Sequence, residues 1–129
     1  MIILNFTQHT LTKEQLDSLV EEGFTLKNVA SEIEAPEYVK NCLTFTECPS
    51  REELKSRAQA LADHAQIHCE ATDVIIGGAP YLMGALETAL IERGIKPRYA
   101  FTERVAVETV NPDGSTTKTS IFRHSGWVV

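Results

Sequence analysis

Three stretches of the sequence carry residues that could do chemistry. "TQHT" (7–10) holds His9 and directly follows an apolar run at the start of the chain, whereas "GGAP" (77–80) follows a second short apolar run. "FTER" (101–104) lies in a third, near the C-terminal end. Histidine can exchange a proton near neutral pH, arginine pairs with phosphates, and glycine amides before a helix bind anions. The combination suits a phosphate or a carboxylate.

The other histidines give weaker indications. His64 and His68 are four residues apart, a spacing that can chelate a metal on a helix, but the H-E-x-x-H pattern is absent and a helix-surface pair is favoured. His124 follows Arg123, and adjacent residues of a strand face opposite sides, so at most one of them should face a common pocket. No serine hydrolase, thiol protease or zinc enzyme constellation is present. We therefore expect neither a metal nor a cofactor.

Size and composition limit the function classes. The chain has 129 residues with 43% apolar content, which fits one compact domain spanning residues 1–129. No window approaches the roughly 18 uninterrupted apolar residues of a membrane span, and no secretion signal follows Met1, so we expect a cytoplasmic protein that does not enter a membrane. The three cysteines lack C-x-x-C spacing, which indicates neither a disulfide framework nor a zinc knuckle.

The charge is unevenly distributed along the chain. The net charge is −6, which argues against a protein that binds long nucleic acid over its whole surface. Residues 1–92 hold 6 Lys and Arg against 15 Asp and Glu, whereas residues 93–129 hold 6 against 3. The basic final third is consistent with a local anion site or with a differently solvated face.

The first half of the chain predicts strands and capped helices. The apolar run 1–6 predicts a strand, which we expect at the centre of a sheet. Thr12 and Gln15 form a capping box that opens a helix ending near Gly23. Residues 24–30 predict a second strand, and only a short helical turn is expected after Pro36. Ser50 and Glu53 predict a second capping box, at the start of a long helix.

The second half completes the pattern. "TDVIIGG" predicts a short buried strand, and the helix after it begins at Pro80 and stops at Gly94. "KPRYAFTERVAVETV" predicts one long strand or two consecutive ones, joined by the turn "NPDG" to a returning strand at residues 115–127. This alternation predicts an α/β fold with an open, mainly parallel sheet, helices on both faces and a C-terminal β-hairpin.

The order of these elements decides how "GGAP" is interpreted. Taken alone, the motif favours a tight strand-to-helix turn, because it matches neither G-x-G-x-x-G nor a P-loop. In an open α/β sheet, however, ligands lie outside the carboxyl ends of the strands. "TQHT", "GGAP" and "FTER" should therefore collect around one crevice. We interpret "GGAP" as a phosphate-facing turn in that crevice.

Three segments together resemble a known family. They are "MIILNFTQHTLTKEQ" at the start, "GGAPYLM" in the middle and "YAFTERVAVETVNPDGSTTKTSIFRHSGW" at residues 99–127. In their order they resemble the small accessory proteins of type III CRISPR systems that include ring nucleases. Residues 24–70 are not part of the resemblance. The matching positions are His9, Leu11, Thr12, Glu14, Gln15, Gly77, Gly78, Tyr81, Leu82, Met83, Thr102, Arg104, Val107, Glu108, Asp113, Gly114, Phe122 and His124.

The resemblance implies a Rossmann-like nucleotide-binding fold and a homodimer that binds cyclic oligoadenylate, a cyclic RNA second messenger. His9 or His124 would then act as acid or base, with Arg104 at the reacting phosphate. The ligand-binding residues would be Thr7, Gln8, Gly77, Gly78, Ala79, Tyr81, Thr102 and Arg123. Metal-independent cleavage requires a ribose 2′-hydroxyl aligned with the adjacent phosphorus, so positioning and charge stabilisation supply most of the rate.

Three functions remain open at this point. The first is a metal-independent phosphodiesterase that destroys the messenger and switches off type III CRISPR signalling. The second is a sensor or sponge that binds the same messenger without cleaving it. The third is a domain that uses the same crevice for another nucleotide or small anion.

Overall fold

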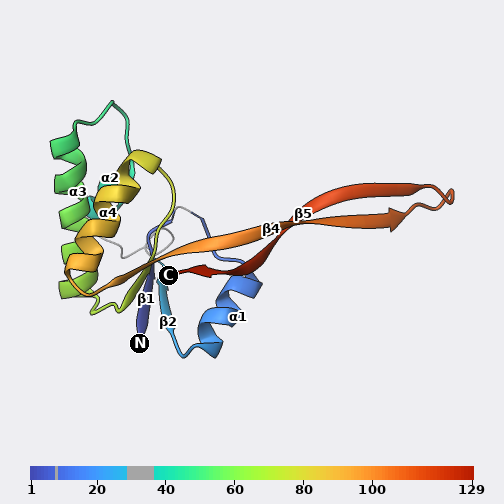
Figure 1. Cartoon of the computed structure of the whole chain (residues 1–129), viewed down its shortest axis with the longest axis horizontal. Helices are drawn as coiled ribbons and strands as arrows, with labels where there is room; N and C mark the ends of the chain where they lie inside the picture. The colour runs from blue at the N-terminus through green and yellow to red at the C-terminus, as the bar shows by residue number, and fades with distance from the viewer. Residues whose placement is uncertain (8, 29–36) are drawn as a thin grey trace.

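The computed structural model of the chain describes residues 1–7, 9–28 and 37–129. A five-stranded sheet, helices and a long C-terminal hairpin make up the fold (Figure 1). No helix in these ranges has the length and apolar character needed to cross a membrane. In chain order the elements are β1 (Ile2–Asn5), α1 (Lys13–Glu21), β2 (Thr25–Asn28), α2 (Glu37–Leu43), α3 (Arg51–Asp63), the π-helix η1 (His64–His68), β3 (Asp73–Ile75), α4 (Pro80–Glu92), β4 (Lys96–Val110) and β5 (Thr116–Val128).

The sheet has the order β2-β1-β3-β4-β5. The first four strands are parallel, and β5 runs antiparallel to β4. The predicted α/β fold with an open, mainly parallel sheet and a C-terminal hairpin is therefore confirmed. The prediction of β1 as the central strand is wrong, because the hairpin adds two strands on one side and makes β3 the middle strand. β1 is nevertheless an interior strand, flanked by β2 and β3.

Helices cover both faces of the sheet. On one face α1 encloses a small core that contains Ile3, Leu19 and Ile75. On the other face α2, α3 and α4 enclose the larger core. Its fully buried members include Leu61, Leu86 and Leu90. Residues of β1 and β3 alternate between the two cores because successive side chains of a strand face opposite sides.

The helix starts follow their capping residues, with one exception. The Thr12 hydroxyl accepts a hydrogen bond from the Gln15 N–H, and the Gln15 side chain accepts one from the Thr12 N–H, so the first capping box is confirmed. Ser50 caps α3 by accepting from the Glu53 N–H at 3.1 Å. The reciprocal half of that box is not formed, because the Glu53 carboxylate pairs with Arg57 one turn further on, at 2.8 Å.

Two other elements differ from expectation. The segment after Pro36 forms α2, which is longer than the single turn predicted from sequence. Residues 29 and 30 of the predicted second strand lie outside the described residues, and β2 occupies Thr25–Asn28. α4 begins at Pro80 and ends two residues before Gly94, as predicted.

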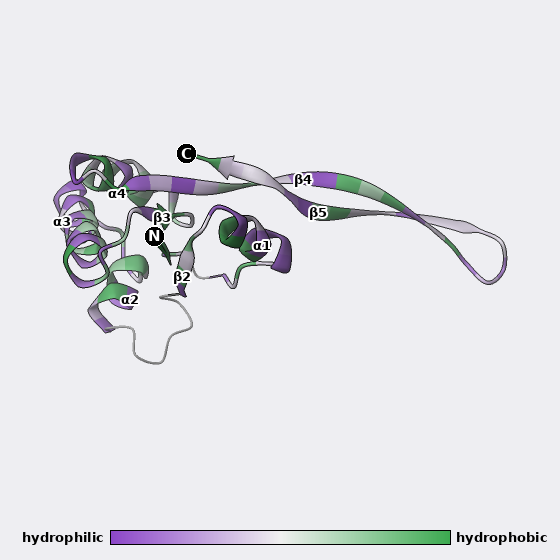
Figure 2. Cartoon of the chain, turned by 90° about the horizontal axis from the view of Figure 1, so that it is seen from below, coloured by the Kyte–Doolittle hydropathy of each residue, from purple (hydrophilic) through white to green (hydrophobic). Residues whose placement is uncertain are grey.

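The hairpin extends well beyond the rest of the molecule. β4 pairs with β3 only at residues 96–98, whereas its pairing with β5 continues to the turn (Figures 1 and 2). We call residues 102–124 the arm and the remaining described residues the body. Nearly all arm side chains are exposed, including Phe122 and Val110 at 69% and 72%. Beyond its base, where Thr102 and His124 face α1, the arm is thus a two-stranded ribbon with no third layer of structure packed on it within the described chain.

The turn at the tip of the arm matches its sequence. Gly114 has φ +85°, a conformation that glycine adopts without strain. The Asp113 carboxylate accepts hydrogen bonds from the Ser115 N–H and hydroxyl, and these bonds hold the pKa of Asp113 below its usual range. The hairpin turn predicted at "NPDG" is confirmed.

Candidate functional site

A buried asparagine organises the loop after β1. Asn5 is fully buried, and its side-chain oxygen accepts a hydrogen bond from the Thr7 N–H at 2.9 Å. Its side-chain nitrogen donates to the His9 carbonyl, also at 2.9 Å. A buried amide with several partners fixes the path of a loop, because breaking any of these bonds would leave a polar group unsatisfied. The backbone at His9 is therefore fixed by the last residue of β1.

A glycine turn joins β3 to α4 next to this loop. The ends of β1 and β3 are level, since the Phe6 N–H donates to the Ile75 carbonyl at 2.9 Å. Gly78 has φ +121°, which few residues other than glycine adopt. Ala79 is the N-cap of α4 and has no side chain that could cap the helix. The turn therefore leaves the positive end of the helix dipole uncapped by protein.

The backbone donors at this turn are few. Pro80 has no N–H, and the Leu82 N–H donates to the Ala79 carbonyl at 3.0 Å. The N–H groups that remain for a ligand are those of Gly78, Ala79 and Tyr81. Helix N-termini of this kind bind phosphates and carboxylates through such groups.

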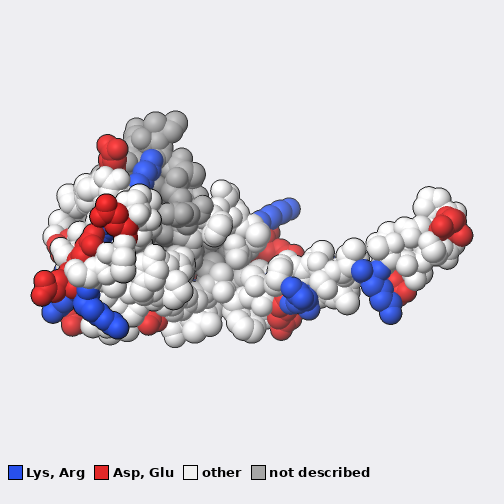
Figure 3. Space-filling view, turned by 90° about the horizontal axis from the view of Figure 1, so that it is seen from above, with Lys and Arg blue, Asp and Glu red and all other residues white. Residues whose placement is uncertain are grey.

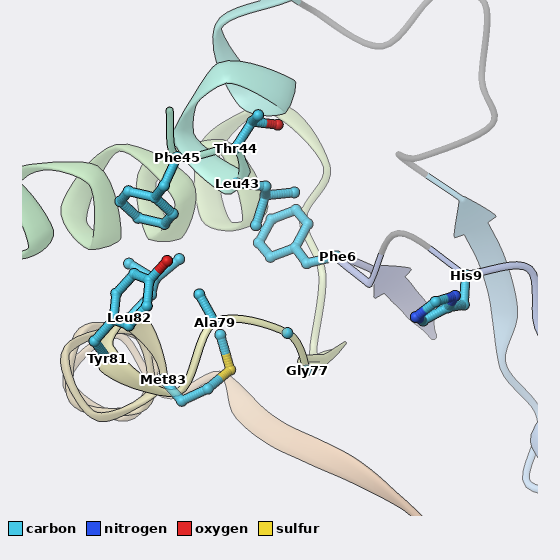
Figure 4. A pocket seen from close by; sticks show the side chains of 11 residues that line it. Phe6, His9, Leu43, Thr44, Phe45, Gly77, Ala79, Tyr81, Leu82 and Met83 are labelled. Carbon is cyan, nitrogen blue, oxygen red and sulfur yellow. The ribbon is translucent and has the colours of Figure 1, made fainter. Parts of the chain in front are cut away.

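The loop and the turn line one cavity of about 380 Å³ (Figure 4). His9 lies at one end of it, and the rings of Phe45 and Tyr81 lie at the other. Gly77 and Ala79 lie between these ends. No Asp, Glu, Lys or Arg is among the described residues that line it, which are Phe6, His9, Leu43, Thr44, Phe45, Gly77, Gly78, Ala79, Tyr81, Leu82 and Met83.

The aromatic end of the cavity is held rigidly. Phe45 and Tyr81 pack edge to face, with ring centroids 5.1 Å apart. The guanidinium of Arg57 lies over the ring of Phe45, 4.3 Å from its centroid. Arg57 also donates to the carbonyls of Asn41 and Thr44 at 2.8 and 2.6 Å. The segment after α2 is thus tied to α3, and Phe45 is positioned before any ligand binds.

The predicted site residues divide between several places. His9, Gly77, Gly78, Ala79 and Tyr81 come together at the cavity. Thr7 does not line it; its hydroxyl hydrogen-bonds to the Asn5 side chain and the His9 carbonyl, and so supports the loop. Gln8 lies outside the described residues.

Thr102 and His124 belong to a second, separate groove of about 320 Å³. They lie opposite each other on β4 and β5, and the start of α1 forms the other wall. His124 Nε2 lies 3.5 Å from the Ser18 hydroxyl, which also accepts from the Trp127 indole at 2.9 Å. His124 Nδ1 is buried and has no hydrogen-bond partner in the described structure. His9 and His124 are therefore not brought into one pocket of a single chain.

Arg104 and Arg123 lie on the arm and line neither cavity. Arg104 stacks over the ring of Phe122 at 5.3 Å, and Arg123 lies opposite Glu103 in the strand pairing. The two arginines are on opposite faces of the ribbon because they occupy adjacent pairs of the ladder. The expected crevice is thus formed by "TQHT" and "GGAP", whereas "FTER" lies apart from it.

His64 is not on the helix surface as predicted. It is only 6% exposed, its Nδ1 lies 2.8 Å from the Tyr38 hydroxyl and its Nε2 lies 3.5 Å from the Cys69 sulfur. Burial lowers the pKa of His64, and the nearby charges of His68 and Lys27 lower it further. Among the described residues, no group of three or more His, Cys, Asp or Glu is arranged to hold a metal ion.

Several important residues were missed by sequence reasoning. Asn5 could have been noticed as a polar residue at the end of an otherwise apolar run. Phe45 and Arg57 gave no signal, because the loop after α2 has no periodic pattern and the contact between them joins separate elements. The buried pair of Asp73 and Arg98, 2.7 Å apart, was also missed.

The fold and the cavity define an α/β protein with an open sheet and a cavity at the carboxyl ends of β1 and β3. The chain belongs to the family described as "Uncharacterized protein MJ1673 family", whose model matches residues 1–128. Comparisons of the chain with curated proteins and with solved structures found no match.

Proposed function

We propose that this protein binds a cyclic oligoadenylate and cleaves it without a metal, acting as a ring nuclease. One observation carries the proposal: His9, the Gly77–Ala79 turn and the aromatic pair of Phe45 and Tyr81 line a single cavity. The ligand class itself comes from the resemblance to type III CRISPR accessory proteins.

The three parts of the cavity match the three parts of a nucleotide. The amides at the start of α4 suit a phosphate. The rings of Phe45 and Tyr81 suit a base, because a purine stacks on an aromatic side chain whatever its sequence context. His9, at the opposite end, can reach a ribose hydroxyl or a phosphate oxygen. The cavity of about 380 Å³ thus has a group suited to each of the phosphate, the base and the sugar.

Cleavage would proceed by attack of a ribose 2′-oxygen on the adjacent phosphorus. A bond from O2′ to phosphorus forms while the bond from phosphorus to O5′ breaks, leaving a 2′,3′-cyclic phosphate and a 5′-hydroxyl. His9 would take the proton of the 2′-hydroxyl, and the leaving O5′ would gain a proton from water. The N–H groups of Gly78 and Ala79 would stabilise charge on the phosphate oxygens.

The proposal includes a homodimer. Arg104 lies on the arm, away from the cavity of its own chain, so it would reach a ring phosphate only from a second copy. The arm also leaves Val105, Val107 and Ile121 partly uncovered on one face, and isolated two-stranded ribbons are marginally stable in water. Twofold symmetry would give a cyclic ligand two equivalent half-sites.

A second candidate function is a sensor or sponge that binds the ring intact. One observation favours it: His9 is the only histidine among the described residues that line the cavity. The other predicted catalytic histidine, His124, lies in the separate groove beside α1. A site with one proton-transfer group can bind a phosphodiester well and cleave it slowly.

One experiment separates these functions. Labelled cyclic tri-, tetra- and hexa-adenylate are incubated with pure protein in EDTA, and the products are run on native and denaturing gels. Linear product with EDTA present supports the ring nuclease. A shifted but intact ring contradicts cleavage and supports the sensor. If no ring is shifted or cut, cyclic oligoadenylate is the wrong ligand, and the third function, another nucleotide or small anion, takes its place.

Variants test the residue roles. His9→Ala should abolish cleavage and leave the gel shift in place, whereas His68→Ala, on an exposed histidine outside the cavity, should leave both unchanged. Arg104→Ala should weaken the shift, and mixing it with His9→Ala should restore part of the cleavage, because a mixed dimer keeps one complete half-site. Full activity of His9→Ala would show that His9 is not the acid or base.

A further inference from the structure

A second cavity adjoins the first and shares a wall with it. It has a volume of about 580 Å³ and is lined by residues of the loop after α2 and by the start of α3. Phe45 and Tyr81 line both cavities. The T-shaped pair of rings therefore forms a wall common to both cavities, and the guanidinium of Arg57 lies over the Phe45 ring.

The second cavity contains a cation that has no partner among the described residues. Arg51, the first residue of α3, lines it and is exposed. Within the described ranges Arg51 makes no ion pair or hydrogen bond, in contrast to Arg57 and Arg93, which are each paired with a carboxylate. An arginine left unpaired at the mouth of a cavity is suited to a phosphate, which it can bind through two parallel N–H groups.

The second cavity also contains one acidic side chain. Glu47 lines it, without an ion pair to Arg51. Its carboxylate would repel a phosphate but can accept a hydrogen bond from a sugar hydroxyl or from the amino group of a base. The polarity of the cavity thus fixes where each part of a nucleotide would lie, with the phosphate beside Arg51 and a donor group beside Glu47.

We infer that the two cavities form one site for two consecutive nucleotides of an oligoadenylate, divided by Phe45 and Tyr81. The first nucleotide occupies the cavity of His9 and the α4 turn. The second occupies the cavity of Arg51, with a base against the shared aromatic wall. The inference rests on the proposed function, and it assigns Arg51, Phe45 and Glu47 to ligand binding. A volume of 380 Å³ is typical of a site for one small ligand, so the ligand needs the second cavity for its next unit.

Calorimetric titration with AMP and with linear diadenylate tests this assignment. The wild-type protein should bind diadenylate at least tenfold more tightly than AMP. Arg51→Gln should weaken diadenylate binding by roughly tenfold or more, as expected for a charge-assisted hydrogen bond, and change AMP binding less than twofold. Lys55→Gln is the matched control, because it removes a positive charge one turn further along the same helix without lining the cavity.

Two further variants sharpen the test. Phe45→Leu keeps the apolar bulk but removes the ring, and should weaken diadenylate binding by roughly fivefold or more. Glu47→Ala removes the acceptor for a sugar hydroxyl or a base amino group, and should weaken diadenylate binding while changing AMP binding less than twofold. Thermal unfolding of each variant shows that the fold is retained, and a loss of affinity counts only for variants that unfold like the wild type.

The outcomes separate the inference from the proposed function. If diadenylate and AMP bind equally and Arg51→Gln alters neither, the second cavity is not a ligand site, and the proposed function stands on the first cavity alone. If the wild type binds no linear or cyclic adenylate, the proposed function is overturned, and this inference with it.

Discussion

The body and the arm are built from the same chain in opposite ways. In the body, the side chains of β1 and β3 are buried against helices, and the core residues Leu61, Leu86 and Leu90 are fully shielded from solvent. In the arm, the same backbone pairing continues from residue 102 to the tip, but beyond the base, where Thr102 and His124 face α1, no helix of the described chain covers either face. The body is held by burial, whereas the arm is held by its hydrogen-bond ladder and its turn. Hydrogen bonds alone contribute little net stability in water, so the arm should open more easily.

The body and the arm also differ in net charge. The arm carries Arg104, Lys118 and Arg123 against Glu103, Glu108 and Asp113, and is therefore neutral, so the body holds the whole net charge of −6. Figure 3 shows basic and acidic side chains next to each other along the arm. A neutral ribbon can approach a second copy of itself without net repulsion. This difference supports the part of the proposal in which the arms mediate dimer formation.

The largest expected difference between the regions concerns apolar burial. Leu86→Ala, in the core between α4 and α3, should lower the free energy of unfolding by about 3–5 kcal/mol, because it leaves a cavity. Ile121→Ala, on the arm and 39% exposed, should cost less than about 1 kcal/mol. Urea unfolding monitored by circular dichroism measures both. Equal losses would contradict the view that the arm has no packed core of its own.

Ion pairs should show the next largest difference. Asp73→Ala removes a carboxylate that is 3% exposed and leaves the buried Arg98 with only the more exposed Glu22, so we expect a loss of about 3 kcal/mol. Glu103→Gln removes the charge opposite Arg123 on the arm and should cost less than about 1 kcal/mol. Chemical unfolding at low and high salt compares them; only the arm variant should lose its effect in high salt.

Changes at a helix cap and at a turn glycine should lower stability by smaller amounts. The effect should extend through the body in the first case and stay within the arm turn in the second. Thr12→Ala removes the cap of α1 and should lower the stability of the whole body by about 1 kcal/mol. Gly114→Ala forces a left-handed conformation on alanine at the arm tip, at a cost of roughly 1–2 kcal/mol that is confined to the turn. Hydrogen exchange measures both at individual amides. Faster exchange in β1 or β3 of the Gly114 variant would show that the two regions unfold together.

The smallest expected effects concern pH, and the two regions should respond in different ranges. Burial lowers the pKa of His64, so the unfolded chain, with a histidine pKa of about 6.5, binds the proton more readily. Body stability should therefore be complete above about pH 6.5 and fall as the pH is lowered further. The pKa of Asp113 is lowered by its bonds to Ser115, so the arm turn should weaken only as the pH falls below about 4.

Thermal unfolding between pH 7.5 and 5, with hydrogen exchange at the arm tip extended to pH 3, measures these two responses. His64→Gln should remove most of the fall in body stability, and His68→Gln, one turn away, should leave the greater part of it. An unchanged slope in the His64 variant would mean that another group causes the pH dependence.

The sequence predicted those features of the fold that depend on residues close together in the chain, and missed features that depend on other contacts. The capping box of Thr12 and Gln15, the start of α4 at Pro80 and the turn at Gly114 each depend on residues within four positions of one another, and all three were predicted. The second capping box failed because Glu53 has a competing partner in Arg57. His64 was misplaced because its neighbours Tyr38 and Cys69 come from outside the helix that carries it.

The candidate site shows the same limit. The sequence correctly brought together His9 and the Gly77–Ala79 turn, because the ends of parallel strands meet at one edge of a sheet. It did not separate them from Thr102 and Arg104, since nothing in a strand pattern says that β4 parts from β3 after residue 98 and continues paired with β5 alone. Phe45 lies in a loop without a recognisable motif, and the capping motif of α3 does not indicate what Arg51 or Arg57 contacts.

By itself, then, the sequence determined the element types, their order and the carboxyl edge at which His9 and the Gly77–Ala79 turn meet, because local propensity and the period of apolar residues fix these. The tertiary structure alone decided which polar side chains share a cavity. That choice depends on where β4 parts from β3, on the Asn5 side chain that holds the loop of His9, and on the Arg57 contacts that place Phe45 against Tyr81. These are contacts between separate elements, and they exist only once the sheet and helices have packed.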